Sequence, residues 1–478
     1  MISKLILKKL SKSQLKIIGL VVLLLALPLI LSTLYHIQNT AGRAALPDQL
    51  ETEAGVLSSS GVTKQSDSEA SKGQFIKFDR NQFVTPTPPS SNVRGPRPAP
   101  AVPTGPGVKI IGIHTVAVDD SGNSDITAAL RTIIGSLNAG DTLVFPQGSV
   151  QGFEHGDTPI SIYRINDPLL MANIPDDITL FGYGTRIVMT NYGNHPTFLV
   201  RSRGVQNLKF QGFELYGRNY PYTRKSNMFS GLSGENDSGI KFEQTHIGTT
   251  MEDLWIHHQN GDGVQQIGWA SVDLYDVADT TLRYSRIEDN SRMGLNPNVG
   301  WNWQVHHNIF GNQGGRNINA EDVRTSNYTP PRLSMYIYEN IFEPSMWEYK
   351  PFGPAIHILL AAWHGTTYSS LGPFVIRDNL ITGMQPIGAA VAGGQTFCFN
   401  MSWPANIGAN YNRVAGMNIT GNVFNLKAGT YDASKTSACR VAAVDRLTIT
   451  NNDFQGFSIL APESGSDLNT NVTISGNK

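Results

Sequence analysis

Side chains that could bind or transform a polar ligand recur in a short repeat between residues 254 and 380. The repeat is an apolar residue, any residue, a second apolar residue, two polar residues and asparagine, as in WQVHHN, MYIYEN and FVIRDN. Alternate residues of a β-strand point to opposite faces, so the residues before and after the second apolar position are predicted to face outward together. The aromatic and basic residues at these positions are Trp255, His257, Arg283, His306, Tyr336, Tyr338 and Arg377.

Two kinds of carbohydrate chemistry fit these residue types. Aromatic rings beside hydrogen-bonding groups suit sugars, because a sugar ring is apolar on its faces and polar at its rim. Arginine or histidine can remove the C5 proton of a uronate, whereas paired carboxyl groups hydrolyse glycosidic bonds. The predicted catalytic residues are Arg283, His306, Glu321 and Asp322. The predicted substrate-binding residues are Trp255, His257, Tyr336, Tyr338 and Arg377.

Structural interpretations of the same residues stay open. Trp303 could pack inward, and other aromatic residues could cover the fold beneath loops. The pairs His257-His258 and His306-His307 could hold a metal ion, but the sequence offers no third ligand, so no metal site is predicted.

The repeat itself indicates the fold. Copies end at Asn308, Asn340, Asn379, Asn422, Asn452 and Asn477. Strands of period two that end at an asparagine are typical of stacked coils, in which the asparagines bond to one another in a ladder. The spacing of the copies is irregular, which excludes leucine-rich, ankyrin and propeller repeats. We therefore predict an all-β fold over residues 108–478, a right-handed parallel β-helix.

The start of this domain carries a helix signal. Ile126, Leu130, Ile133, Ile134 and Leu137 form one apolar face, and AGDTLVFPQG follows as a turn and a strand. This helix is predicted to cap the first coil. The segment resembles the beginning of proteins of the pectate-lyase-like superfamily, and residues 174–478 resemble the β-helix repeats of carbohydrate-active proteins.

The resemblance implies the scaffold and a broad class of activity. We expect a polysaccharide lyase or glycoside hydrolase, with Ca²⁺ as a cofactor if the chain is a lyase. The aspartate pairs, Gly-His-Gly and Arg-x-Lys of polygalacturonases are absent, as is an aspartate-rich calcium cluster. No catalytic residue is therefore carried over from the family. The alternative is a non-catalytic adhesin or glycan-binding protein of the cell envelope.

The N-terminal residues predict a membrane anchor. Residues 17–35 carry no charge and are long enough to span a bilayer, and the basic segment 1–16 should stay in the cytoplasm. A cleavable signal peptide is the alternative, and both place the domain outside the cell. Residues 36–107, rich in proline towards the end, are predicted to be a disordered linker.

Three further expectations concern partners and bonds. The net charge of −1 argues against a nucleic-acid partner. Cys398 and Cys439 follow successive ladder asparagines at similar offsets, which predicts a disulfide. Val472 and Ile474 form an edge strand that could pair with another copy, so self-association is expected.

Overall fold

The structure is a computed structural model of the whole chain. It describes residues 62–66, 74–78, 94–146, 161–191, 193, 195–217, 236–267, 277–311, 313–320, 333–343, 356–359, 371–382, 396–402, 414–425, 436–441, 444–460 and 469–478. The chain divides into two compact units, Met1–Pro86 and Thr87–Lys478. In the first unit, the described residues form an antiparallel hairpin of β1 (Val62–Ser66) and β2 (Gln74–Phe78).

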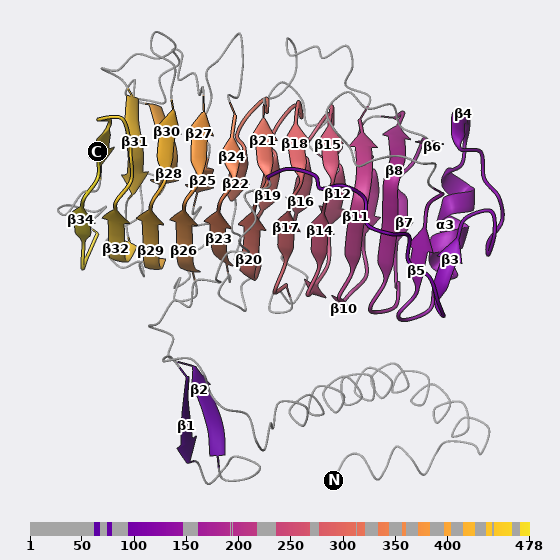
Figure 1. The fold of residues 1–478 in the computed structure, drawn as a ribbon, viewed down its shortest axis with the longest axis horizontal. Coiled ribbons are helices and arrows are strands. Elements are labelled where there is room, and N and C mark those ends of the chain that lie inside the picture. Colours follow the sequence, from indigo (N-terminus) through magenta and orange to yellow (C-terminus); the bar gives the residue numbers. More distant parts are fainter. Residues whose placement is uncertain are drawn as a thin grey trace, which may run out of the picture. The chain divides into compact units, whose positions relative to one another are not determined.

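The second unit is the predicted parallel β-helix, in which successive coils stack strand on strand (Figure 1). In each coil the chain runs along a strand of sheet A, turns a corner into a strand of sheet B, and then forms a strand of sheet C. Sheet A contains β3 (Val108–Ile110), β5 (Thr142–Val144), β8 (Thr179–Met189), β11 (Lys209–Tyr216), β14 (Thr250–Glu252), β17 (Thr281–Arg283), β20 (Gly300–His306), β23 (Leu333–Tyr338), β26 (Leu371–Arg377), β29 (Val414–Thr420), β32 (Val444–Thr450) and β34 (Thr473–Ser475).

The two remaining sheets complete the coils. Sheet B contains β4 (Ser121–Asp125), β6 (Ser161–Ile165), the second halves of β8 and β11, β15 (Trp255–His257), β18 (Arg286–Glu288), β21 (Ile309–Gly311), β24 (Ile341–Phe342), β27 (Leu380–Thr382) and β30 (Val423–Asn425). Sheet C contains β7 (Leu169–Met171), β9 (Phe198–Val200), β12 (Ile240–Phe242), β16 (Val264–Gln266), β19 (Leu295–Pro297), β22 (Ile318–Ala320), β25 (Ile356–Leu359), β28 (Thr396–Ser402), β31 (Thr436–Val441) and β33 (Ser458–Leu460). A separate parallel pair joins β10 (Val205–Gln206) to β13 (His246–Ile247).

The corner between sheets A and B holds the predicted asparagine ladder. The backbone N–H of a ladder asparagine donates to the side-chain oxygen of the asparagine in the next coil along the chain. Asn308 donates in this way to Asn340 (3.0 Å), and Asn340 donates to Asn379 (3.0 Å). The residue before each asparagine takes a positive φ, as at His307 and Glu339, which turns the chain sharply enough for the asparagine to point inward. The ladder prediction is confirmed.

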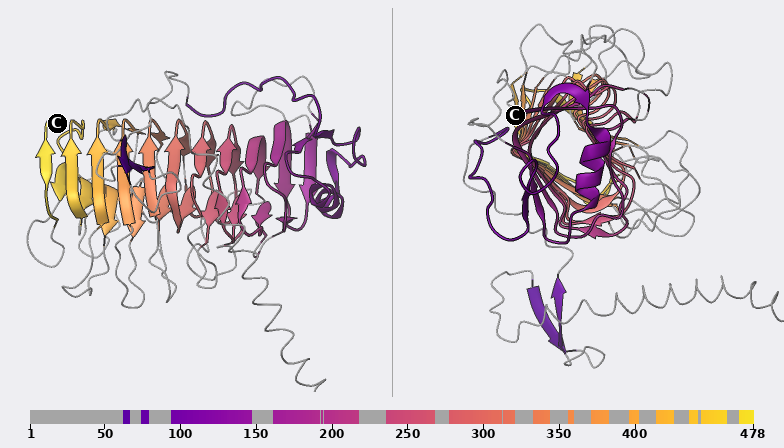
Figure 2. Two further views of the ribbon diagram at one scale, coloured as in Figure 1. Left: turned by 90° about the horizontal axis from the view of Figure 1, so that it is seen from below. Right: turned by 90° about the vertical axis from the view of Figure 1, so that its right-hand side faces the viewer.

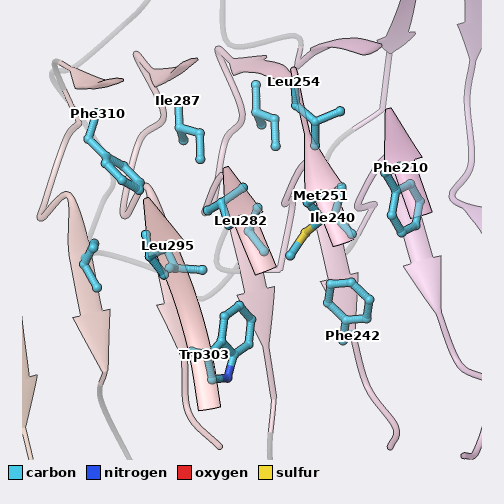
Figure 3. Close-up of a cluster of buried hydrophobic side chains, with 14 of the residues drawn as sticks. Phe210, Ile240, Phe242, Met251, Leu254, Leu282, Ile287, Leu295, Trp303 and Phe310 are labelled. Atoms are coloured by element: carbon cyan, nitrogen blue, oxygen red, sulfur yellow. The ribbon is translucent and has the colours of Figure 1, made fainter. Parts of the chain in front are cut away.

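The interior of the coils is apolar and closely packed (Figure 3). Phe310 and Phe342 stack in successive coils, with ring centroids 5.4 Å apart. Trp303 is fully buried among these side chains, so the inward interpretation of this residue is the correct one. The period-two pattern therefore predicted which residues fill the core.

The predicted capping helix is α3 (Thr127–Gly135), which lies across the open end of the first coils (Figure 2). Its buried face includes Leu130, Ile133 and Ile134. Asp125 accepts hydrogen bonds from the backbone N–H and the hydroxyl of Thr127, which fixes the start of the helix.

The prediction of a disordered linker over residues 36–107 is not supported, because β1 and β2 pair within this range and the residues from Arg94 onward contact the β-helix. Residues 94–107 are described and do not leave the β-helix; the backbone N–H of Gly95 donates to the carbonyl oxygen of His307 (2.9 Å). The predicted span 17–35 lies outside the described residues. Within the part of the chain that the structure does describe, no helix has the length and apolar character needed to cross a bilayer.

Strand β34 ends sheet A in the described residues and exposes an edge. Ile474 is 43% exposed, and Thr473 and Ser475 beside it are exposed as well. The self-association expected from this edge stays a prediction.

Candidate functional site

Four of the predicted site residues form one column on sheet A. Arg283 on β17 lies in register with His306 on β20, which is followed by Tyr338 on β23 and Arg377 on β26. The rings of His306 and Tyr338 stack with centroids 4.8 Å apart, and the guanidinium carbon of Arg377 lies 4.6 Å from the centre of the Tyr338 ring. Tyr336 lies on the same face, two residues before Tyr338. The predicted register is confirmed for these residues, and the first four are called the arginine column below.

The middle of the arginine column is closed to solvent. His306 is 5% exposed and Tyr338 is 3% exposed. Burial lowers the pKa of His306 to about 3, and the neighbouring His307 and Arg283 add to this effect. Burial also raises the pKa of Tyr338 to about 12. Both side chains are therefore neutral near pH 7, and their rings pack against each other instead of facing a ligand.

Trp255 and His257 do not join this column, so their predicted place was wrong. Arg283 pairs with Glu252, whereas Trp255 and His257 on β15 pair with Arg286 and Glu288 in sheet B. The stretch TMEDLWIHHQ contains two triplets with an apolar centre, and a period of two fits either one. The residues predicted to form one patch therefore lie on two faces, sheet A and sheet B, on either side of the corner.

In sheet B these two residues are held by buried carboxylates. The imidazole of His257 contacts Glu214 through Nε2 (2.9 Å), and the indole N–H of Trp255 donates to Glu288 (2.9 Å). The indole and imidazole rings stack with centroids 4.2 Å apart. Arg186 also donates to Glu214 (2.6 Å). The polar atoms of Trp255 and His257 are thus bonded to other side chains of the protein, which indicates a structural role for these two residues.

A third polar face, on sheet C, was missed from the sequence. Four successive strands place one polar residue each at their outward centre, with apolar neighbours such as Ile240 and Leu295 in the core. These residues are Lys241, Gln265, Asn296 and Asn319, and they are called the amide row below. Like the arginine column they are buried, at 0–6% exposed. The backbone register continues it to His357, Asn400 and Arg440.

The amide row gave little signal because its strands are short and end without an asparagine. The usable pattern was an apolar residue followed by an amide after a turn, in GVQ, GLN and NIN. A strand of three residues shows too little alternation to be separated from a loop.

A buried carboxylate lies beside the amide row. Asp262 is fully buried and accepts hydrogen bonds from the backbone N–H of Met293 (3.1 Å) and from the side-chain amide of Asn296 (3.1 Å). Arg292 lies 3.5 Å from the same carboxylate. An aspartate in such a setting can hold or transfer a proton next to a bound hydroxyl group.

Two amide oxygens at this place lack a partner in the structure. The side-chain oxygens of Asn296 and Asn298 are buried and accept no hydrogen bond from the residues that the structure describes. An unpaired buried acceptor costs about 1–3 kcal/mol, so a hydroxyl group or water that donates to it would be bound favourably. Sugars supply such donors at a high density.

The connections of sheet C also distinguish it. Segments 218–235, 268–276, 321–332 and 344–355 each lead into or out of one of its strands, and long connections on a rigid scaffold are where binding residues concentrate. The predicted catalytic residues Glu321 and Asp322 directly follow β22. They lie outside the described residues, so their role stays a prediction.

Neither metal binding nor the disulfide gains support. No group of three metal-ligating side chains occurs among the described residues. The two rings of a histidine pair contact each other, as between the Nδ1 atoms of His306 and His307 (2.9 Å).

For the predicted disulfide, the backbone register places Cys439 opposite Phe399, one residue beyond Cys398. The side chain of Cys398 lies outside the described residues, so the disulfide stays a prediction.

Comparison with known proteins gave structural likenesses only. No family model and no curated protein matches the chain. Among solved structures, the catalytic unit of a GH87 α-1,3-glucanase from Streptomyces thermodiastaticus is 16% identical, with a TM-score of 0.44, covering 80% of this chain and 70% of that one. An alginate lyase from Paenibacillus is 12% identical, with a TM-score of 0.40, covering 74% and 92%.

A third similar structure is a tailspike protein of E. coli bacteriophage HK620 in complex with a pentasaccharide. It is 12% identical, with a TM-score of 0.40, covering 75% of this chain and 63% of that one. At such identities a likeness concerns the fold alone. The chain is a right-handed parallel β-helix protein, as the repeat predicted and as its own strand register shows.

Proposed function

We propose that this chain binds a polysaccharide along the amide row and cleaves it there. The observation that carries the proposal is the unpaired, buried oxygen of Asn296 beside the buried carboxylate of Asp262. A sugar hydroxyl that donates to Asn296 would satisfy this acceptor. Gln265 and Asn319 lie one strand away on either side, so a chain molecule lying along the coils would meet an amide at each step.

The chemistry proposed for this face is acid–base catalysis. Asp262 would act on the glycosidic oxygen or on a water molecule, and Arg292 would stabilise its ionised form. Hydrolysis needs a second carboxyl group, and we assign this role to Glu321, which follows the amide-row strand β22 in the chain. The predicted roles of Arg283 and His306 are not kept in this proposal, because the ring of His306 stacks on Tyr338 and its lowered pKa makes it a weak base near pH 7.

A glycan-binding protein without catalysis is the second candidate. It is favoured by the amides themselves, since Gln265, Asn296 and Asn319 recognise hydroxyl groups but do not transfer protons. A panel of polysaccharides separates the two candidates. New reducing ends indicate hydrolysis, unsaturated products indicate elimination, and binding without either product indicates a binding protein.

Gln265→Ala is expected to weaken binding of the polysaccharide found in the panel by about three- to tenfold, the share of one hydrogen bond. The measurement is the dissociation constant from calorimetry or fluorescence titration. Gln304→Ala is the matched control, because Gln304 points outward from β20 in sheet A and should leave affinity unchanged. Equal losses in both variants would contradict binding at the amide row.

We also propose that the chain is anchored in the cell membrane by residues 17–35, with the β-helix outside the cell. The uncharged run and the five lysines that precede it support this topology. Membrane fractionation with alkaline extraction should retain the chain in the pellet, and protease added to intact cells should remove the β-helix. Recovery in the soluble fraction after extraction would contradict the anchor.

A further inference from the structure

The segment before the first coil runs along the outside of the corner between sheets A and B. The Nε of Arg94 donates to the carbonyl oxygen of Glu339 (2.7 Å), and the backbone N–H of Gly95 donates to that of His307 (2.9 Å). Arg97 reaches Asp253, and Ala99 packs beside Tyr183. The segment therefore crosses successive coils towards the capped end, as the indigo trace shows in Figure 1. Residues 94–97 are called the arm.

Arg97 is held by a pocket that fits a guanidinium group. Its Nε and Nη2 donate to the two oxygens of Asp253 (2.9 and 2.6 Å), and Nη2 also donates to Glu252 (2.9 Å). The guanidinium carbon lies 4.0 Å from the centre of the Tyr284 ring. Such a two-pronged contact with a carboxylate over an aromatic ring is geometrically specific for arginine.

Both carboxylates of the pocket also bond to residues of the coils. Asp253 accepts a further hydrogen bond from the hydroxyl of Tyr183 (2.6 Å). Glu252 is also bound by Arg283, the first member of the arginine column (2.7 Å). Neither bond involves the arm, so both carboxylates have anchors other than Arg97.

Gly95 is fitted to its position as closely as Arg97. It is buried and has a φ of +79°, and a Cβ atom here would lie 2.8 Å from the Cδ1 of Ile309. Pro96 follows and keeps the chain extended. Beyond the arm the contacts weaken, because Pro98, Pro100 and Val102 are exposed.

We propose that the arm is a releasable clip, anchored by Arg97 in the pocket of Glu252, Asp253 and Tyr284, which covers the corner beside the arginine column. The clip holds Arg94 at the coil of Glu339. Release of the clip exposes Asp253 and Tyr284, which are 1% and 4% exposed while the arm is docked. This inference is independent of the function proposed for the amide row.

The test uses the full chain in detergent and two measurements. Hydrogen–deuterium exchange at residues 94–97 reports whether the arm is docked, and fluorescence anisotropy reports binding of a labelled peptide of residues 91–100. We expect Arg97→Ala to speed exchange of the arm at least tenfold. The emptied pocket of this variant should then bind the peptide, whereas the wild-type chain should not. A peptide carrying Arg97→Lys should bind the emptied pocket at least tenfold more weakly.

Two further variants keep the test decisive. Gly95→Ala should also release the arm, because a φ of +79° strains an alanine and its Cβ would press on Ile309, and it leaves every pocket residue intact. Arg201→Ala, which removes an arginine paired with Glu243 elsewhere, should alter neither measurement. The clip is wrong if exchange in the arm is unchanged by Arg97→Ala and Gly95→Ala. It is also wrong if the wild-type chain binds the peptide as well as the variants do.

Discussion

Replacing Asn379 by alanine is expected to destabilise the β-helix by about 2–4 kcal/mol, because it leaves several buried polar groups without partners. The side-chain amide of Asn379 donates to the carbonyl oxygen of Ile337 (3.0 Å) and to the oxygen of Asn422 (2.9 Å). Its own oxygen accepts from the backbone and the side chain of Asn340 (3.0 Å each). Asn379 is 1% exposed, so water cannot replace these bonds.

The measurement is urea-induced unfolding of residues 87–478, followed by circular dichroism. Asn425→Ala is the control, because Asn425 lies on a strand of the same solenoid but is exposed, and it should shift stability by less than about 0.5 kcal/mol. If the two variants unfold at the same urea concentration, the ladder contributes no more than a surface asparagine does.

Asp262→Asn is expected to lower turnover of the polysaccharide by about 10²–10⁴-fold, the usual range for a lost acid–base group. Asparagine keeps the shape of the side chain and an oxygen that can accept from the N–H of Met293, so folding should be preserved. Initial rates at saturating substrate, with melting curves for both proteins, provide the measurement.

Asp445→Asn is the matched control for this substitution. Asp445 lies partly exposed on β32 and accepts hydrogen bonds from Thr470 and Asn471, and its carboxylate has no proposed part in catalysis. Full activity of Asp262→Asn would restrict Asp262 to a structural role and would contradict catalysis by this carboxylate.

The fold was predictable because the repeat carries two independent signals. Alternation of apolar residues gave the inward face, as for Val305 and Ile337, and the recurring asparagine gave the corner. Together they fixed the register of Arg283, His306, Tyr338 and Arg377 without a structure. The two signals could not predict how exposed these side chains are, because a residue that points away from the core can still be buried by the arm and by its neighbours.

The remaining errors have local causes. Thr250–Glu252 and Trp255–His257 are equally good strands, so the alternation alone could not decide which one stacks on Arg283. The arm was read as linker because a run of prolines and glycines resembles a disordered spacer. Its docking depends on Asp253, which is far away in sequence, and on a glycine that must approach Ile309 closely.

The amide row could not be found from the repeat, because each of its strands contributes only one outward residue. Its polar residues become a row only when four coils are stacked, and the sequence does not show how the turns before them align. The carboxylate of Asp262 could not be singled out either, because its NGDG context is also that of an ordinary turn.

The most direct test of the proposed function is to locate a bound glycan on the three sheets. Hydrogen–deuterium exchange of the full chain should be compared with and without the polysaccharide that binds in the panel. We predict slower exchange in β16, β19 and β22, the strands of Gln265, Asn296 and Asn319, with sheets A and B unchanged. Protection confined to β17, β20 and β23 of sheet A, or no protection in any strand at saturating glycan, would contradict the account.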